Sequence, residues 1–238
     1  MSELDNPVWS ALTTRQEALG HVGRTAARFD PAVSPFAAFS GPPTPDHWAE
    51  LADLIGPSGL AALVHRPDGA TGLTPPTGWI GNWKARAHQM VGRDFAFGSA
   101  RTARVGDDRI QPLGPGDVAA MLALVELARP GPFLARTVEF GGYVGIRRGG
   151  HLVAMAGERL QPPGYVEISA VATHPDHRRQ GLAERLVASV ASSILERGEV
   201  PVLHVSEDNS GAVALYEAMG FVTRTRIAFE LFKAPVAG

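Results

Sequence analysis

The chain has 238 residues, of which 45% are hydrophobic, with a formal net charge of −2 and no cysteine. This length lies between one large domain and two small ones, and the hydrophobic fraction is enough for a sizeable core. The near-neutral charge gives no field that broadly favours nucleic acid or an anionic membrane, and the lack of cysteine excludes disulfides, thiol nucleophiles and cysteine-bound metals.

The N-terminus does not resemble a targeting segment. Residues 1–6 lack the basic region followed by an apolar run that a secretory signal has. No uninterrupted apolar stretch is long enough to cross a bilayer. We therefore expect a cytoplasmic protein with neither a membrane nor a nucleic acid as partner.

Residues 1–103 carry no catalytic signature and are interrupted by prolines and glycines. Asn6 followed by Pro7 predicts a short first helix. A capping box at residues 14–17 predicts a second helix that runs toward Phe29. We treat this part as an N-terminal domain of unassigned role.

Three more elements are expected in this N-terminal part. Thr44 followed by Pro45 predicts the start of a helix that ends at Gly56. Residues 60–64 form a short candidate for a buried strand, and residues 79–83 form another strand. The two tryptophans in the second strand are interpreted as core or interface residues, with a ligand site as the alternative.

From about residue 105 the hydrophobic pattern becomes regular. The expected elements are a strand at 109–113, a helix at 118–128, a short helix at 134–139, a hairpin at 143–160, a strand at 165–173, a helix from 182 to Gly198, a strand at 200–205, a helix at 211–219 and a closing pair of strands at 221–225 and 227–232.

The centre of this second part is the stretch at residues 167–183. A strand there leads through a turn into a helix that opens just after Gly181. The first N–H groups of a helix have no intrahelical partners, and the helix dipole adds partial positive charge. With Arg178 and Arg179 beside it, and with Gly181 allowing close approach, the turn favours an anion such as a pyrophosphate.

Two signatures support this interpretation. Residues 178–183 fit Q/R-x-x-G-x-G/A, and residues 209–221 fit N-x-x-A-x-x-L-Y-x-x-x-G-F. Both belong to the GCN5-related N-acetyltransferases (GNAT), and they occur in the expected order. The chain therefore resembles this superfamily over about residues 105–233, and the order of its motifs resembles that of the FR47-like branch.

The resemblance implies an α/β (α+β) fold, the GNAT acyl-CoA N-acyltransferase fold. Its mixed central sheet has two neighbouring parallel strands that splay apart to admit the cofactor. We expect a GNAT N-acetyltransferase domain at residues 104–238, preceded by an α/β segment at residues 1–103. Three interpretations of that segment stay open: a degenerate relative of the same fold, a lid, or a dimerisation element that would make the protein a homodimer.

The cofactor implied by the resemblance is acetyl-CoA. Backbone groups of the central strand would pair with the pantetheine arm, and the N–H groups of residues 179–184 would hold the pyrophosphate. Asn209 would contact the pantetheine, although it also precedes a helix and fits an N-cap. The cofactor-binding set is Val171, Ala172, Thr173, Arg178, Arg179, Gln180, Gly181, Leu182, Ala183, Glu184, Asn209 and Tyr216.

Two residues are catalytic candidates by their family positions. Glu167 would act as general base, and partial burial would raise its pKa toward a working value. The alternative is an ordinary strand carboxylate that faces water or pairs with an arginine. Tyr216 would act as general acid toward the departing thiolate, and its alternative is a packed helix tyrosine.

The expected activity is acetyl-CoA-dependent transfer of an acetyl group to a primary amine by direct attack in a ternary complex. An acyl-CoA-binding regulatory module without turnover and an N-acyltransferase for a bulkier acyl group are the alternatives. The acceptor is not identified; its walls are expected at residues 129–133, after Leu160 and at residues 224–226. His174 and His177 lack further spaced ligands, so no metal is expected.

Overall fold

A computed structural model of the chain describes residues 2–66, 72–93 and 109–236. Its helices are α1 (Pro7–Leu12), α2 (Pro45–Ile55), α3 (Val118–Ala128), α4 (Leu182–Glu196) and α5 (Ser210–Ala218). Its strands are β1 (Gly20–Val22), β2 (Ala26–Phe29), β3 (Phe36–Phe39), β4 (Leu60–His65), β5 (Ile80–Val91), β6 (Ile110–Pro112), β7 (Val144–Arg148), β8 (His151–Glu158), β9 (Tyr165–Thr173), β10 (Val200–Ser206) and β11 (Val222–Lys233). Short 3-10 turns are η1 (Glu3–Asp5), η2 (Glu17–Leu19), η4 (Pro115–Asp117), η5 (Thr137–Phe140) and η6 (Pro175–His177).

Within the described residues, the strands form one mixed sheet in the order β1-β2-β3-β4-β11-β5-β10-β9-β8-β7-β6. β3 pairs with β4 in parallel, β9 pairs with β10 in parallel, and the other neighbours are antiparallel. The predicted α/β architecture with a mixed sheet is confirmed.

Outward from the β11–β5 pair, the neighbouring strands on both sides follow the same sequence of antiparallel and parallel pairings. On one side β2, β3 and β4 follow an antiparallel and then a parallel pairing, with α2 connecting the parallel pair. On the other side β8, β9 and β10 repeat this pattern, with α4 as the connection. The long strands are exchanged: β5 of the first half pairs with β10, and β11 of the second half pairs with β4. Of the three interpretations of the N-terminal segment, a degenerate relative of the same fold is the one that predicts such a repeat.

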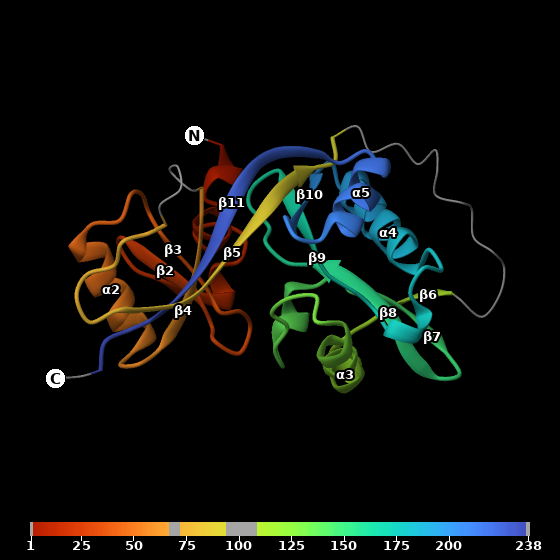
Figure 1. The fold of residues 1–238 in the computed structure, drawn as a ribbon, viewed down its shortest axis with the longest axis horizontal. Coiled ribbons are helices and arrows are strands. Elements are labelled where there is room, and N and C mark those ends of the chain that lie inside the picture. The colour runs from red at the N-terminus through yellow and green to blue at the C-terminus, as the bar shows by residue number, and fades with distance from the viewer. Residues whose placement is uncertain (1, 67–71, 94–108, 237–238) are drawn as a thin grey trace.

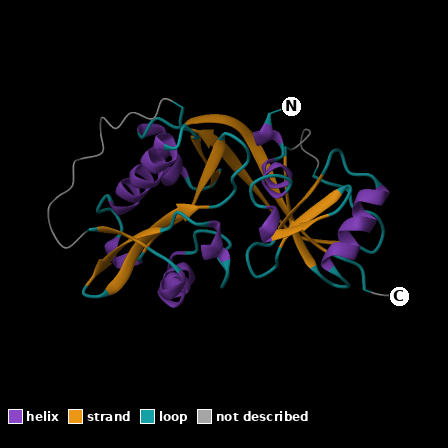
Figure 2. Cartoon of the chain, turned by 180° about the vertical axis from the view of Figure 1, so that it is seen from behind, coloured by secondary structure: helices purple, strands orange, loops and turns teal. Residues whose placement is uncertain are grey.

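Figure 1 shows β5 and β11 running side by side from one half of the molecule to the other, with α2 at one end and α4 and α5 at the other. Seen from behind in Figure 2, α2 lies on the outer side of one group of strands, α4 and α5 lie on the outer side of the other, and the short helix near the N-terminus lies between the groups. The predicted boundary between residues 103 and 104 lies outside the described residues and stays a prediction.

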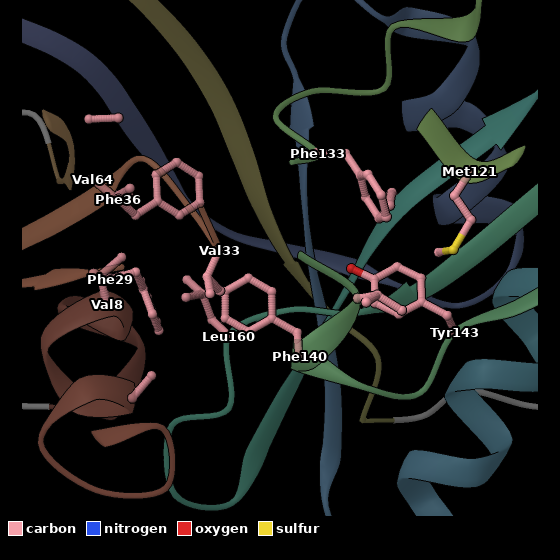
Figure 3. Packing of buried hydrophobic residues seen from close by; sticks show 14 of the residues in the cluster. Val8, Phe29, Val33, Phe36, Val64, Met121, Phe133, Phe140, Tyr143 and Leu160 are labelled. Atoms are coloured by element: carbon pink, nitrogen blue, oxygen red, sulfur yellow. The ribbon is translucent and has the colours of Figure 1, made fainter. Parts of the chain in front are cut away.

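The core also joins the two halves. Figure 3 shows Phe29 and Phe36 of the first half beside Phe140 of the second. The rings of Phe29 and Phe140 meet edge to face, with centroids 5.2 Å apart. Val8, Val33, Leu160 and Tyr143 belong to the same buried cluster. The halves are therefore fixed against each other by shared strands and by a shared core.

Local sequence rules explain the helices that were predicted well. In α2, Pro45 occupies the first turn, and Gly56 follows the last residue with φ of 74°. In α4, the buried stripe includes Leu186 and Val190, which face the sheet.

The predicted helix from residue 14 toward Phe29 is wrong. The Thr14 hydroxyl donates to the Ser10 carbonyl oxygen, 2.5 Å away, instead of capping a new helix. Only the short turn η2 forms, and β1 and β2 follow it because β2 pairs with β3 across Ala27 and Ala38. Long-range pairing outweighs local helix preference here.

Two other predicted elements differ. The closing pair of strands at 221–225 and 227–232 is the single strand β11, because β5 offers it a continuous partner and a bulge between Thr223 and Thr225 absorbs the irregularity. The short helix expected at 134–139 is the 3-10 turn η5. Among the helices of the described residues, none is long and apolar enough to cross a membrane.

Candidate functional site

The site begins where the parallel strands β9 and β10 separate. They pair from Tyr165 and Val200 up to Ile168 and Leu203, and no further. Beyond this point β10 stays paired with β5, while β9 continues along β8 to Thr173. Among the described residues, the edge of β9 that faces β10 therefore has no strand partner over residues 169–173, although the Thr173 carbonyl oxygen accepts from Arg178 Nε at 3.5 Å. The predicted splaying of two parallel strands is confirmed.

A bulge shapes this edge. Ala170 and Val171 of β9 lie together opposite the single residue Ala156 of β8. Ala170 has φ of 51°, a left-handed conformation that is unusual for alanine. Bulges change the direction of backbone groups, and strained residues of this kind cluster at functional sites.

A cleft of about 1490 Å³ opens between the separated strands. Eleven of the twelve residues predicted to hold the cofactor line it: Val171, Ala172, Thr173, Arg178, Arg179, Gly181, Leu182, Ala183, Glu184, Asn209 and Tyr216. Gln180 is not part of the lining, and its side-chain oxygen accepts a hydrogen bond from Arg148 Nη1 at 2.6 Å.

The turn before α4 has the backbone of an anion site. Arg179 has φ of 60° and Gly181 has φ of 75°, so left-handed residues alternate through the turn. Such alternation turns successive N–H groups toward one point, and the start of α4 adds its own free donors. A Cβ placed on Gly181 would meet nothing within 4 Å, so the space in front of the turn is open.

Asn209 combines the two expected features. Its side-chain oxygen accepts a hydrogen bond from the Ala212 N–H at 3.2 Å and so caps α5. It also lines the cleft. Capping fixes the start of the helix that carries Tyr216.

Tyr216 lines the cleft from α5 and is otherwise almost fully buried. Burial raises the pKa of its hydroxyl to about 12, so the group stays protonated at neutral pH. In the described part of the chain the hydroxyl has no hydrogen-bond partner, and the ring packs against Phe221 with centroids 6.2 Å apart.

Glu167 lies behind the cleft wall and is 1% exposed. Arg159 donates to it from Nε at 2.9 Å and from Nη2 at 2.5 Å. The Leu160 N–H and His204 Nδ1 also contact the carboxylate, at 3.3 and 2.7 Å.

The expectation of a raised pKa for Glu167 is wrong. Burial alone raises the pKa, but the Arg159 charge and the hydrogen bonds from Arg159 and His204 outweigh it and hold the pKa well below its usual range. The carboxylate is therefore ionised, and its oxygens are held by Arg159, His204 and the Leu160 N–H. Glu167 does not line the cleft. Its role as general base stays a prediction that must account for this position.

His204 was not predicted as a site residue. It lines the cleft from β10, and its Nε2 lies 3.1 Å from Nε2 of Gln89. That Gln89 nitrogen also donates to the Leu4 carbonyl oxygen, and Oε1 of Gln89 accepts from Arg224, so the amide donates to His204. In this arrangement Nε2 of the imidazole accepts from the Gln89 amide, and Nδ1 faces the Glu167 carboxylate. A histidine in the strand directly before the second signature was the sequence feature that could have identified it.

The predicted walls of an acceptor site meet the cleft only in part. Residues 129–132 line the cleft, whereas the segments after Leu160 and at 224–226 do not, and the place of the acceptor stays a prediction. The N-terminal half and β11 also contribute to the cleft wall, with residues that include Phe36, Trp83 and Phe229. Of the two tryptophans, Trp83 belongs to the cleft and Trp79 packs on Trp48.

Known proteins match both the second half and the whole chain. The profile of the FR47-like protein family matches residues 143–229. N-alpha-acetyltransferase RimI from Mycobacterium tuberculosis is 39% identical over 82 residues. That match covers 33% of this chain and 51% of RimI, so the chain spans about half the length of this relative.

Two solved structures extend over the N-terminal half. A GNAT-family protein from Novosphingobium aromaticivorans is 35% identical, with a TM-score of 0.84, over 99% of this chain and 100% of that one. A GCN5-related N-acetyltransferase from Kribbella flavida has a TM-score of 0.63 over 98% of this chain and 96% of that one, and at 18% identity it shows the fold alone. The identity and coverage of the first of these show that the chain belongs to the GNAT family of acetyltransferases, as its FR47-like motifs indicated.

Proposed function

We propose that this protein is an acetyl-CoA-dependent N-acetyltransferase that moves an acetyl group to a primary amine by direct attack in a ternary complex. The observation that carries the proposal is the convergence of three features on one cleft. These are the free edge of β9, the alternating left-handed turn before α4, and the Tyr216 hydroxyl.

The residues present fit acetyl-CoA. The free backbone groups at residues 169–173 can pair with the amides of the pantetheine arm, as an added strand would. The N–H groups of residues 179–184 can hold the pyrophosphate, with Arg178 and Arg179 nearby. When bound, acetyl-CoA supplies the activated acyl thioester.

Tyr216 is proposed as the general acid. Burial keeps the hydroxyl protonated at neutral pH, so it can donate a hydrogen bond to the sulfur as the thiolate departs and deliver a proton there as the C–S bond breaks. The hydroxyl has no competing partner in the part of the chain that the structure describes. Its position on the capped helix α5 holds it at the cleft wall.

For the amine proton, we propose that Glu167 acts through His204. The imidazole lies in the cleft wall, and its Nε2 accepts a hydrogen bond from the side-chain amide of Gln89. Uptake of a proton there requires that hydrogen bond to break, and the ionised Glu167 then stabilises the imidazolium.

This relay and direct action by Glu167 are separable. The relay predicts that His204→Gln lowers kcat about a hundredfold or more even with Glu167 intact, in the range of general-base effects. Full turnover in His204→Gln would contradict the relay and return the role to Glu167 or to water.

The test of the function is coenzyme A release, measured with a thiol reagent across a panel of amines. Amine-dependent release accompanied by equal amounts of acetylated amine supports the proposal. Saturable acetyl-CoA binding without release for any amine identifies a binding module. Faster release with a longer acyl chain identifies an acyltransferase for a bulkier group.

A further inference from the structure

Beyond the point where β9 and β10 part, the cleft continues between the two halves, and its walls there are apolar. In the sheet, Leu231 of β11 lies between Ala62 of β4 and Trp83 of β5. The rings of Phe229 and Phe36 follow along the same wall, with centroids 5.8 Å apart. Strands from four places in the chain therefore combine into one apolar surface.

Part of this surface faces water in the free protein. Trp83 is 56% exposed and Leu60 is 50% exposed, and both line the cleft. Large apolar side chains that are exposed inside a concave site commonly mark the place of a ligand. This end of the cleft therefore fits the apolar body of an acceptor.

The charges at this end are positive. Glu184 is the one carboxylate among the described lining residues, and it belongs to the first turn of α4 at the phosphate end. The acceptor end has Arg129 and Arg159 instead. Arg86 also touches the cleft, but strand alternation sends its side chain to the face opposite Ala85 and Ala87, so it is no candidate for a ligand contact.

Arg159 is a preorganised donor. Nε and Nη2 are held by Glu167, and the guanidinium carbon lies 4.8 Å from the centre of the Phe36 ring. Nη1 has no hydrogen-bond partner in the described part of the chain. An arginine fixed by an ion pair and a ring retains a donor that can bind an oxygen of a ligand at little entropic cost.

Arg129 is the second donor, and its backbone is unusual. It ends α3 in a left-handed conformation, φ 51° and ψ 55°, where glycine or asparagine is the ordinary residue. Its exposed guanidinium has no partner among the residues that the structure describes. A strained residue that presents an unpaired charge into a cleft is a candidate functional group.

We propose that the acceptor is a small apolar amine that also carries a carboxylate, of the size and class of a hydrophobic α-amino acid. Arg129 and Arg159 bind the carboxylate, and the wall of Phe36, Trp83, Phe229 and Leu231 holds the side chain. This inference rests on the proposed function. It disfavours polyamines and other polycations, because the acceptor end has no carboxylate among its described residues to bind their extra charges.

The experiment compares kcat/KM for L-phenylalanine, L-phenylalanine amide, 2-phenylethylamine and spermidine at saturating acetyl-CoA. We expect L-phenylalanine to exceed each of the other three by at least about tenfold, because a site built for a polar group rejects analogues that lack it. Arg129→Gln should lower the value for L-phenylalanine about tenfold and the value for 2-phenylethylamine less than about threefold. Arg24→Gln is the matched control, since Arg24 is exposed and lies outside the cleft, and it should change neither.

Four results overturn the inference. If kcat/KM for 2-phenylethylamine or the amide equals or exceeds that for L-phenylalanine, the site does not recognise the carboxylate. If spermidine has the highest kcat/KM, the site binds polycations. In both cases the proposed transferase function stands. Loss of L-phenylalanine turnover of the same size in Arg24→Gln as in Arg129→Gln shows a general charge effect. No release with any amine refutes the proposed function and this inference together.

Discussion

At the scale of single residues, the Tyr216 hydroxyl separates a catalytic role from a packing role. The ring is buried against Phe221, and the hydroxyl has no partner in the described chain, in a residue that lines the cleft. Removal of one oxygen would leave that packing almost unchanged.

Tyr216→Phe should therefore lower kcat by about tenfold or more, with little change in melting temperature or acetyl-CoA affinity. Tyr165→Phe is the control, because it removes a hydroxyl that contacts Arg93 at 2.7 Å, away from the cleft lining. Stopped-flow or steady-state coenzyme release with a true acceptor measures both. Equal kcat for Tyr216→Phe and wild type, with chemistry rate-limiting, would assign Tyr216 to packing alone.

The buried pair of Glu167 and Arg159 has a consequence for stability. Glu167→Gln leaves the Arg159 charge buried without its partner, which should lower the free energy of unfolding by about 3 kcal/mol at neutral pH. Because the folded-state pKa of Glu167 is depressed, its contribution is complete above the pKa of an unfolded glutamate, about 4.3, and is lost as the pH falls below that value.

The difference in unfolding free energy between wild type and Glu167→Gln should thus shrink as the pH falls from about 6 to about 3.5. Chemical denaturation at a series of pH values measures it. Glu126→Gln, a change at an exposed carboxylate of α3, should show no such difference at any of these pH values. A difference that is constant or grows toward acid pH would show that Glu167 is not held ionised by its partners.

At the scale of elements, the turn before α4 is the part of the site with the simplest test. Gly181→Val places a branched side chain in the open space before the helix, where the pyrophosphate would lie. We expect acetyl-CoA affinity to fall by at least about a hundredfold, because several backbone donors to the anion are blocked together.

Gly198→Val provides a close control. Gly198 follows the same helix at its other end and has φ of 76°, and a Cβ added there would also meet nothing within 4 Å, so the backbone strain is matched. Calorimetric titration of both folded variants with acetyl-CoA should show loss for Gly181→Val alone. Unchanged affinity in Gly181→Val, or equal loss in both variants, would remove the turn from the cofactor site.

The local structure of the proposed cofactor end could be predicted from sequence because its residues lie in two short contiguous segments. The turn at residues 178–183 and the helix that carries Tyr216 each encode their geometry locally, through a glycine, an N-cap and a hydrophobic stripe. The environment of Glu167 could not be predicted in this way, because Arg159 and His204 lie elsewhere in the sequence and contact Glu167 only in the folded sheet. The pKa of Glu167 was expected to be raised because only its burial was considered, and not the contacts with Arg159 and His204 that lower the pKa.

The acceptor end could not be predicted for a related reason. Phe36, Trp83 and Phe229 are ordinary apolar residues in their own strands, and only the order of β3, β4, β11 and β5 places them on one wall. The same long-range pairing replaced the helix expected at residues 14–29 with strands. Patterns of period 2 or 3.6 do not contain this information.

At the scale of the whole molecule, the two halves are bound by exchanged strands. β11 has both of its neighbours, β4 and β5, in the N-terminal half, and β10 pairs with β5 as well. The second half alone would expose both edges of β11 and one edge of β10. Unpaired edges of this length promote aggregation.

We therefore predict that a fragment of residues 104–238 is insoluble or aggregated when produced alone. Coexpression with residues 1–103 should restore a soluble complex, because β4 and β5 of that fragment can pair with β10 and β11 without a covalent link. Size-exclusion chromatography and acetyl-CoA titration of the copurified halves measure this. A monomeric fragment 104–238 with the affinity of the intact chain would show that the halves are independent domains.

The same arrangement makes one cleft from both halves: the residues of the proposed cofactor end belong to the second half, and both halves contribute to the proposed acceptor wall. Direct transfer within this cleft is the central claim. Among the described lining residues there is no cysteine, and Tyr216 is a protonated phenol rather than a nucleophile at neutral pH. We propose attack by the amine itself, in a ternary complex, rather than transfer through an acylated protein side chain.

Initial rates measured over a grid of acetyl-CoA and amine concentrations test this claim most directly. Direct attack in a ternary complex predicts double-reciprocal lines that intersect, and a protein whose mass is unchanged after incubation with acetyl-CoA alone. Parallel lines together with an acetylated protein that passes its acetyl group to the amine would contradict the account.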